Sequence, residues 1–143
     1  MGRIMAIDYG QKRAGIAVTD ELQMIATSLT TVRSHDILTF LKDYISVNQV
    51  DCFVVGEPRQ MNNQASESFK FVEPFIRRLQ KEFPGIPVER MDERFTSKMA
   101  FQTMIDAGLR KKERQRKELV DTISATIILQ SYLEYRSNLK VRN

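Results

Sequence analysis

Residues 4–19, with the sequence IMAIDYGQKRAGIAVT, decide the fold of this chain. They comprise an apolar run at 4–7 that ends at Asp8, a turn that contains Gly10, and a second run at 14–19 that is rich in small and β-branched residues. Both runs have the composition of β-strands. Because the link between them is short, an antiparallel hairpin is favoured over a crossover connection.

The rest of the chain alternates between further strands and amphipathic helices. Strands are expected at residues 25–32, 52–55 and 88–92, and helices at 36–47, 66–83 and 119–135, with one more helix from Thr96 or Ser97 to Gly108. Ser34 is expected to cap the first helix, and His35 is interpreted as a residue at its start. Pro74 is expected to kink or split the second helix.

This order predicts an α/β fold. Three consecutive strands followed by alternating helices and strands indicate a five-stranded mixed sheet flanked by helices. The expected strand order is 3-2-1-4-5 with the second strand antiparallel to the others, which is the ribonuclease H-like arrangement. The 143 residues contain no internal repeat and no linker, so residues 1–143 are expected to form a single domain.

The composition excludes several classes of protein. Cys52 is the only cysteine and His35 the only histidine, so a disulfide scaffold is impossible and a zinc site of the usual ligands is not expected. No apolar run approaches the roughly 20 residues of a membrane-spanning helix. Asp8 also interrupts the stretch where a signal peptide needs an apolar core. The expected location is therefore the cytoplasm, without membrane association.

The net charge of +4 is concentrated near the C-terminus. Residues 110–143 hold nine Lys or Arg against four Asp or Glu, and most of this excess lies in the run RKKERQRK at 110–117. Such a run produces a local positive potential that suits a phosphate backbone. A solvated loop has the same composition, so the run indicates nucleic-acid binding only beside a site that acts on phosphates.

Acidic residues follow several of the predicted strands. Asp8 ends the first strand, Glu57 follows the fourth, Asp92 and Glu93 end the fifth, and Asp121 starts the last helix. In sheets of this kind, sites form at the carboxyl ends of the strands. Oxygen ligands without histidine or cysteine suit Mg²⁺ or Mn²⁺, and two such ions about 4 Å apart promote hydrolysis of a phosphodiester. A lone acid at a strand end is also typical of a turn or a cap.

Four sequence blocks resemble the motifs of the YqgF/RuvX family of pre-16S rRNA nucleases, which are also described as Holliday-junction-resolvase-like proteins. They are residues 8–20 (DYGQKRAGIAVTD), residues 54–58 (VVGEP) with Met61, residues 92–97 (DERFTS) and residues 121–133 (DTISATIILQSYL). The blocks occur in the family's order and span nearly the whole chain.

The resemblance implies a ribonuclease H-like nuclease that matures the 5′ end of 16S ribosomal RNA. Carried over by position, the catalytic and metal-binding acids are Asp8, Glu93 and Asp121, with Mg²⁺ or Mn²⁺ as the cofactor. Asp8 is expected to bridge two metal ions, while Glu93 and Asp121 each complete one coordination sphere. This chain departs from the family pattern at Glu57, where an apolar residue is expected. Glu57 therefore either replaces or supplements Glu93 as a ligand, or caps the Pro58 turn or pairs with Arg59.

Basic residues near these acids are the expected nucleic-acid contacts. Lys12 and Arg13 lie in the turn after Asp8, where they can hold the scissile phosphate, and Arg94 can orient Glu93 or contact substrate. The basic run is expected to bind the phosphate backbone through Arg110, Lys111, Lys112 and Arg114.

The expected partner is a ribosomal RNA precursor. Two alternatives stay open: a resolvase acting on branched DNA, which would need a symmetric dimer, and an RNA-binding module without catalysis. The expected oligomeric state is a monomer or a weak homodimer.

Overall fold

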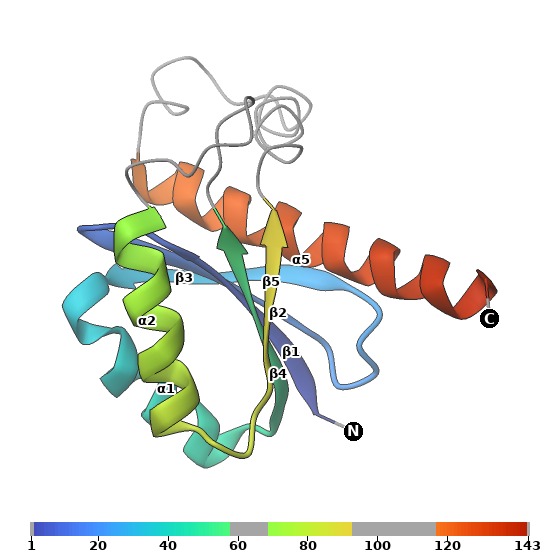
Figure 1. Cartoon of the computed structure of the whole chain (residues 1–143), viewed down its shortest axis with the longest axis horizontal. Helices are drawn as coiled ribbons and strands as arrows, with labels where there is room; N and C mark the ends of the chain where they lie inside the picture. Colours follow the sequence, from blue (N-terminus) through green and yellow to red (C-terminus); the bar gives the residue numbers. More distant parts are fainter. Residues whose placement is uncertain (1, 58–68, 93–116, 143) are drawn as a thin grey trace.

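A computed structural model describes residues 2–57, 69–92 and 117–142, and its centre is a five-stranded sheet (Figure 1). The strands are β1 (Arg3–Tyr9), β2 (Arg13–Thr19), β3 (Ala26–Arg33), β4 (Val50–Glu57) and β5 (Val88–Asp92). Their order in the sheet is β3-β2-β1-β4-β5, which confirms the predicted 3-2-1-4-5 arrangement.

The pairing of the strands is mixed, also as predicted. β2 is antiparallel to β1 and β3, whereas β1, β4 and β5 are parallel neighbours. The carboxyl ends of β1, β3, β4 and β5 therefore lie at one edge of the sheet. The turn between β1 and β2 lies at the same edge, because β2 runs in the opposite direction.

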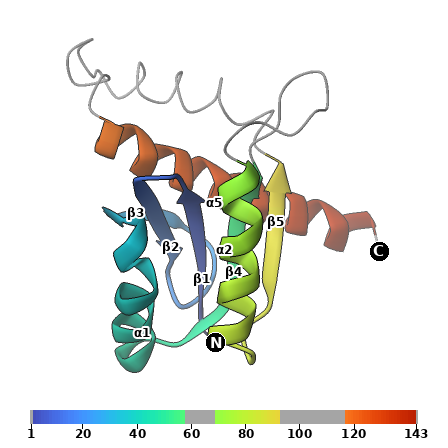
Figure 2. The ribbon, with the colours of Figure 1, turned by 60° about the vertical axis from the view of Figure 1, so that its left-hand side comes forward.

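The helices form a layer on each face of the sheet. A short 3₁₀ helix η1 (Ser34–Asp36) leads into α1 (Ile37–Val47), and two further helices are α2 (Phe69–Glu82) and α5 (Lys117–Arg142). Figure 2 shows α1 and α2 covering one face, with α5 crossing the other. The expected helix between Thr96 or Ser97 and Gly108 lies outside the described residues.

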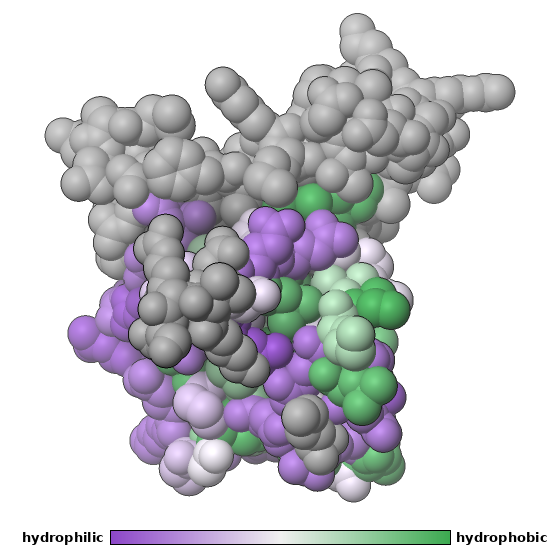
Figure 3. Space-filling view, turned by 90° about the vertical axis from the view of Figure 1, so that its right-hand side faces the viewer, coloured by the Kyte–Doolittle hydropathy of each residue, from purple (hydrophilic) through white to green (hydrophobic). Residues whose placement is uncertain are grey.

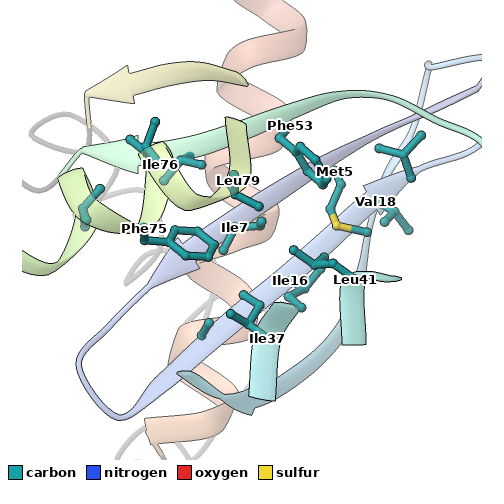
Figure 4. Packing of buried hydrophobic residues seen from close by; sticks show 14 residues of the cluster. Met5, Ile7, Ile16, Val18, Ile37, Leu41, Phe53, Phe75, Ile76 and Leu79 are labelled. Atoms are coloured by element: carbon teal, nitrogen blue, oxygen red, sulfur yellow. The ribbon is translucent and has the colours of Figure 1, made fainter. Parts of the chain in front are cut away.

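The larger core lies between the sheet and the pair α1 and α2 (Figure 4). Alternate residues of the central strands point into it, including Met5, Ile7 and Phe53, and they meet Leu41 of α1 and Phe75 of α2. Burial of apolar surface at about 25 cal/mol per Å² makes this layer the main source of stability.

A second core lies under α5. Ile4 and Ala6 of β1 pack with Ala125 and Leu129 of α5, and both helical residues are fully buried. Close to this core, the Ser28 and Thr126 hydroxyls are 2.7 Å apart and fix α5 against β3. The helix is thus held across the face of the sheet opposite to α1 and α2.

One local expectation was wrong, and for a second the structure decides one of two alternatives. Ser34 does not cap the first helix: α1 begins after Asp36 and has no side-chain cap, and the Ser34 hydroxyl donates instead to the carbonyl of Gly10 at 2.6 Å. Pro74 does not split α2, which is continuous over Phe69–Glu82. A kink at Pro74, the other alternative, stays a prediction.

The surface on the side of the β2–β3 connection carries apolar residues beside polar ones (Figure 3). Leu22, Met24 and Ile25 of that connection are each about two thirds exposed or more. Among the described residues, no helix has the length and apolar character needed to cross a membrane.

Candidate active site

Asp8 lies near the carboxyl end of β1, on the face of the sheet that α5 covers. Its two neighbours in the strand face the other way: Ile7 is part of the core under α1 and α2, and the ring of Tyr9 stacks on Phe75 of α2 with centroids 4.1 Å apart. Because successive side chains of a strand alternate between faces, Asp8 shares its face with Ala6, which packs beneath α5.

Glycines flank Asp8 on the adjacent strands. Gly15 of β2 is its partner in the β1–β2 register. On the other side, Ile7 pairs with Val55, so the next residue of β4, Gly56, comes alongside Asp8. Both glycines are buried and neither carries a side chain. The two strand positions beside Asp8 therefore place no side chain next to its carboxylate.

The start of α5 brings Asp121 to the same region. In both Figure 1 and Figure 2 the first turns of α5 lie beside the turn between β1 and β2. Asp121 lies in α5 one turn before Ala125, which is buried against the sheet. The predicted placement of Asp8 and Asp121 near one edge is thus supported by the backbone.

Glu57 belongs to the opposite face. It pairs in register with Asp92 and is nearly buried, and its Oε1 accepts a hydrogen bond from Arg90 of β5 at 3.0 Å. Arg90 also donates to Glu73 of α2 at 3.0 Å, which places the whole group on the side of α1 and α2. The structure therefore separates Glu57 from Asp8, and the ion partner of Glu57 is Arg90.

Charge pairing in this group shifts the pKa values of Glu73 and Arg90. The hydrogen bond from Arg90 lowers the pKa of Glu73 below its ordinary value. Hydrogen bonds to Glu73 and Glu57 raise the pKa of Arg90 further, so its guanidinium is charged at any accessible pH. The group ties the ends of β4 and β5 to α2 at the edge where the site residues lie.

The turn after Asp8 is held rigidly. The Gly10 N–H donates to the carbonyl of Arg13 at 2.9 Å, and a Cβ on Gly10 would lie 2.8 Å from that oxygen, so the turn requires glycine. Ser34 binds the turn from outside, since its hydroxyl donates to Gly10 and its N–H donates to the carbonyl of Lys12 at 3.0 Å. The backbone at Lys12 and Arg13 is therefore fixed beside the end of β1, and the binding of phosphate by these residues stays a prediction.

The remaining predicted site residues lie outside the described part of the chain, namely Glu93, Arg94, Arg110, Lys111, Lys112 and Arg114. Glu93 directly follows Asp92, the last residue of β5. For Asp121 the helical backbone is described. Within the described residues there is no group of three metal-ligating side chains. The proposed ligand set extends beyond them, so it stays a prediction.

Comparison with known proteins identifies the family of this chain. The family model described as "RuvX: Holliday junction resolvase" matches residues 2–135. The chain belongs to this RuvX family. A relative from Bacteroides thetaiotaomicron, named "Putative pre-16S rRNA nuclease", is 60% identical over 134 residues, covering 94% of this chain and 97% of the relative. A relative of the same name from Flavobacterium psychrophilum is 58% identical over 133 residues, covering 93% and 97%.

Solved structures of more distant proteins share the fold. The RuvX-family chain superimposes on Thermus thermophilus RuvC, solved "in complex with Holliday junction substrate", with a TM-score of 0.58 at 16% identity, covering 96% of this chain and 97% of that one. A second RuvC structure from the same organism gives a TM-score of 0.55 at 14% identity, covering 95% and 96%. These similarities confirm the ribonuclease H-like fold.

Two basic residues beside the turn between β1 and β2, Arg33 and His35, were not predicted as site residues. Arg33 and His35 line a hollow together with Lys12 and Arg13. Arg33 ends β3 and is the register partner of Arg13. The sequence signal that could have indicated this proximity is the predicted pairing of the second and third strands, because an antiparallel β3 brings its last residues to the start of β2.

Proposed function

We propose that this RuvX-family chain is a metal-dependent endonuclease that hydrolyses a phosphodiester bond near the 5′ end of the 16S ribosomal RNA precursor. The observation that carries the proposal is the placement of Asp8 at the end of β1, on the α5 face and between two buried glycines. The start of α5, with Asp121, lies at the same edge. The names of the relatives supply the substrate. Action on a ribosomal precursor places the protein in the cytoplasm.

The residues at this edge fit a hard divalent cation. Asp8, Glu93 and Asp121 would hold it through carboxylate oxygens, which are the donors that Mg²⁺ and Mn²⁺ prefer. Asp8 is partly exposed, and its neighbours in the strand register, Gly15 and Gly56, carry no side chain. Such an ion, when bound, neutralises phosphate charge and lowers the pKa of a bound water.

The chain's own residues bind and orient the substrate. Lys12 and Arg13 contact the scissile phosphate from the rigid turn after Asp8, and Arg13 can do so through two parallel hydrogen bonds. Arg94 follows Glu93 directly and orients it or contacts the RNA. The basic run holds the flanking backbone through Arg110, Lys111, Lys112 and Arg114. In the reaction a water oxygen bonds to phosphorus while one ester P–O bond breaks.

A second candidate is cleavage of branched DNA. It is favoured by the description of the matching family model as a Holliday junction resolvase. Phosphate contacts carry little sequence information, so the same residues could serve either substrate. A resolvase must cut two strands symmetrically, which needs a homodimer, whereas cleavage of an RNA leader needs one site on a monomer or weak homodimer.

A paired cleavage assay distinguishes these functions. The wild-type protein, Asp8→Asn and the control Asp43→Asn, which changes an exposed acid of α1, are each given a 16S 5′-leader RNA and a four-way DNA junction with Mg²⁺ or Mn²⁺. We expect metal-dependent cutting of the RNA by the wild type and by Asp43→Asn, and none by Asp8→Asn.

Two other results would overturn this proposal. Symmetric paired nicks in the junction, without RNA cleavage, would establish the resolvase. RNA binding without metal-dependent cutting by the wild type would establish a binding module that lacks catalysis.

A further inference from the structure

A basic hollow lies at the end of the β1–β2 hairpin. It has a volume of about 450 Å³ and is lined by Gln11, Lys12, Arg13, Arg33 and His35. Its lining comes from four places: the β1–β2 turn, the first residue of β2, the last residue of β3 and η1. Among the described residues that line the hollow, none is acidic. Its positive potential is therefore suited to an anion.

Two arginines on neighbouring strands line this hollow. Arg13 and Arg33 are register partners in the antiparallel β2–β3 pair. A phosphate accepts bidentate hydrogen bonds from arginine. A phosphate in this hollow would therefore lie beside two guanidinium groups that suit it chemically.

The backbone around the hollow is fixed in advance. Ser34 lies between Arg33 and His35, is nearly buried and donates two hydrogen bonds to the β1–β2 turn. The imidazole of His35 is held by Asp36, with Nε2 and Oδ1 3.2 Å apart. Because the turn and η1 are joined in this way, the basic side chains start from a rigid frame and lose little backbone freedom on binding.

The hollow is close to Asp8 and on a continuous part of the same sheet face. In the register of the sheet, Asp8 is opposite Gly15, and Gly15 is opposite Thr31. Arg13 and Arg33 are the register pair two residues further towards the carboxyl edge, so their side chains belong to the same face of the sheet as that of Asp8. At about 3.3 Å per residue and 4.8 Å between strands, the Arg33 Cα is about 7 Å along and about 10 Å across from that of Asp8. A nucleic-acid backbone spans that distance within a few phosphates.

We propose that Arg33 and His35 bind a second RNA phosphate a short distance along the strand from the cut phosphate, which Lys12 and Arg13 contact. The proposal rests on the nuclease function proposed above and adds two residues to it. The RNA would follow the carboxyl edge of the sheet from Asp8, past the start of β2, to the end of β3. This second contact fixes the direction in which the strand lies across the sheet.

His35 allows the site to be observed directly. It is the only histidine of the chain, so its ring signals in an NMR spectrum of the untagged protein are identified without assignment. Addition of inorganic phosphate or of a short single-stranded RNA should shift them saturably, whereas chloride at matched ionic strength should not. Arg33→Gln should remove the shift, while Arg78→Gln, which removes an exposed charge of α2, should preserve it. Equal shifts with chloride would contradict the site.

A binding measurement locates the phosphate. Single-stranded RNAs copying the 16S leader, each with one neutral methylphosphonate, are titrated with wild-type and Arg33→Gln protein. One methylphosphonate position should weaken wild-type binding roughly tenfold, as expected for loss of a charge-assisted contact, and should have no effect on Arg33→Gln. When the logarithm of the binding constant is plotted against the logarithm of the salt concentration, the slope for Arg33→Gln should be about 0.7 smaller in magnitude than the wild-type slope. Identical methylphosphonate profiles for the two proteins would overturn the proposal.

These readouts separate this proposal from the nuclease function. They need no cleavage, because they are recorded without divalent metal. Wild-type cleavage of the leader together with unchanged methylphosphonate profiles would refute the second phosphate site alone. A position-specific loss in the profile without any cleavage would refute the nuclease function and retain the binding site.

Discussion

Glu57 of β4 accepts a hydrogen bond from Arg90 of β5 at 3.0 Å, on the face of the sheet opposite to Asp8. The separation follows from strand alternation, since the register pairs Ile7 with Val55 and thus aligns Glu57 with Tyr9 and not with Asp8. An acid at the end of the fourth strand is therefore part of the scaffold in this chain. Its ion pair joins the strands whose ends carry the site.

Loss of Arg90 should destabilise the fold. Arg90→Met leaves the nearly buried Glu57 and the adjacent Glu73 without their common cation. We expect a loss of about 1–3 kcal/mol in the free energy of unfolding, because charge-assisted hydrogen bonds to two carboxylates are removed. Urea denaturation measures it. The double variant with Glu57→Leu should recover part of the loss, and an undiminished loss would show that the pairing with Glu57 is unimportant.

The same group predicts a pH dependence. Arg90 lowers the pKa of Glu73 in the folded protein, so the stabilisation is present above the pKa of the unfolded state, about 4.3, and is lost as pH falls through the folded pKa. We expect the melting temperature to decrease below about pH 4 in the wild type. This decrease should be smaller in Glu73→Gln, and parallel curves for the two proteins would contradict the assignment.

Gly10 should not tolerate a side chain. A Cβ at this position lies 2.8 Å from the Arg13 carbonyl, whereas one at Gly85 meets nothing within 4 Å. Gly10→Ala should cost about 1–3 kcal/mol of stability through overpacking and should weaken RNA binding by displacing Lys12 and Arg13. Gly85→Ala is the control and should be close to neutral in denaturation and in binding. Equal behaviour of the two variants would refute the steric argument.

Cys52 should be chemically inert in the folded protein. Burial, followed by the charge of Glu89, raises the pKa of its thiol to about 11, so little thiolate exists near neutral pH. We expect a thiol reagent at pH 8 to react roughly a hundredfold more slowly than with unfolded protein. The folded protein thus favours the neutral thiol. The contribution of this residue to the free energy of unfolding is therefore present in full below the thiol pKa of the unfolded chain, and it is lost as the pH rises through the folded pKa of about 11. Rapid labelling of native protein would contradict this burial.

Local patterns predicted the elements of the fold well because the information is local. The hairpin at residues 4–19 follows from two apolar runs around Gly10, and the alternation of strands and helices implied the sheet order. The strands are longer than their apolar runs: β1 begins at Arg3 and β4 continues to Glu57. Polar residues at strand ends are held by backbone pairing, which the composition does not reveal.

Contacts between distant segments were not predictable in this way. Ser34 resembled a helix cap, but its hydroxyl binds Gly10, which is 24 residues away. Glu57 resembled a ligand or a turn residue, but its partner Arg90 is 33 residues further along the chain. The sequence was sufficient to predict that the site lies at the carboxyl edge of the sheet. The face of the sheet on which each acid lies could be determined only from the register of β1, β2 and β4.

The placement of the active site at Asp8, on the α5 face, is tested most directly by comparing two carboxylates at one edge of the sheet. Initial rates of Mg²⁺-dependent cleavage of the 16S 5′-leader RNA are measured for wild type, Asp8→Asn and Glu57→Gln, each checked for its fold by circular dichroism. Asp8→Asn should lose about a thousandfold in rate, or about 4 kcal/mol of transition-state stabilisation, and Glu57→Gln should cleave at close to the wild-type rate. A wild-type rate for Asp8→Asn, with cleavage lost in Glu57→Gln, would contradict the placement of the active site on the α5 face.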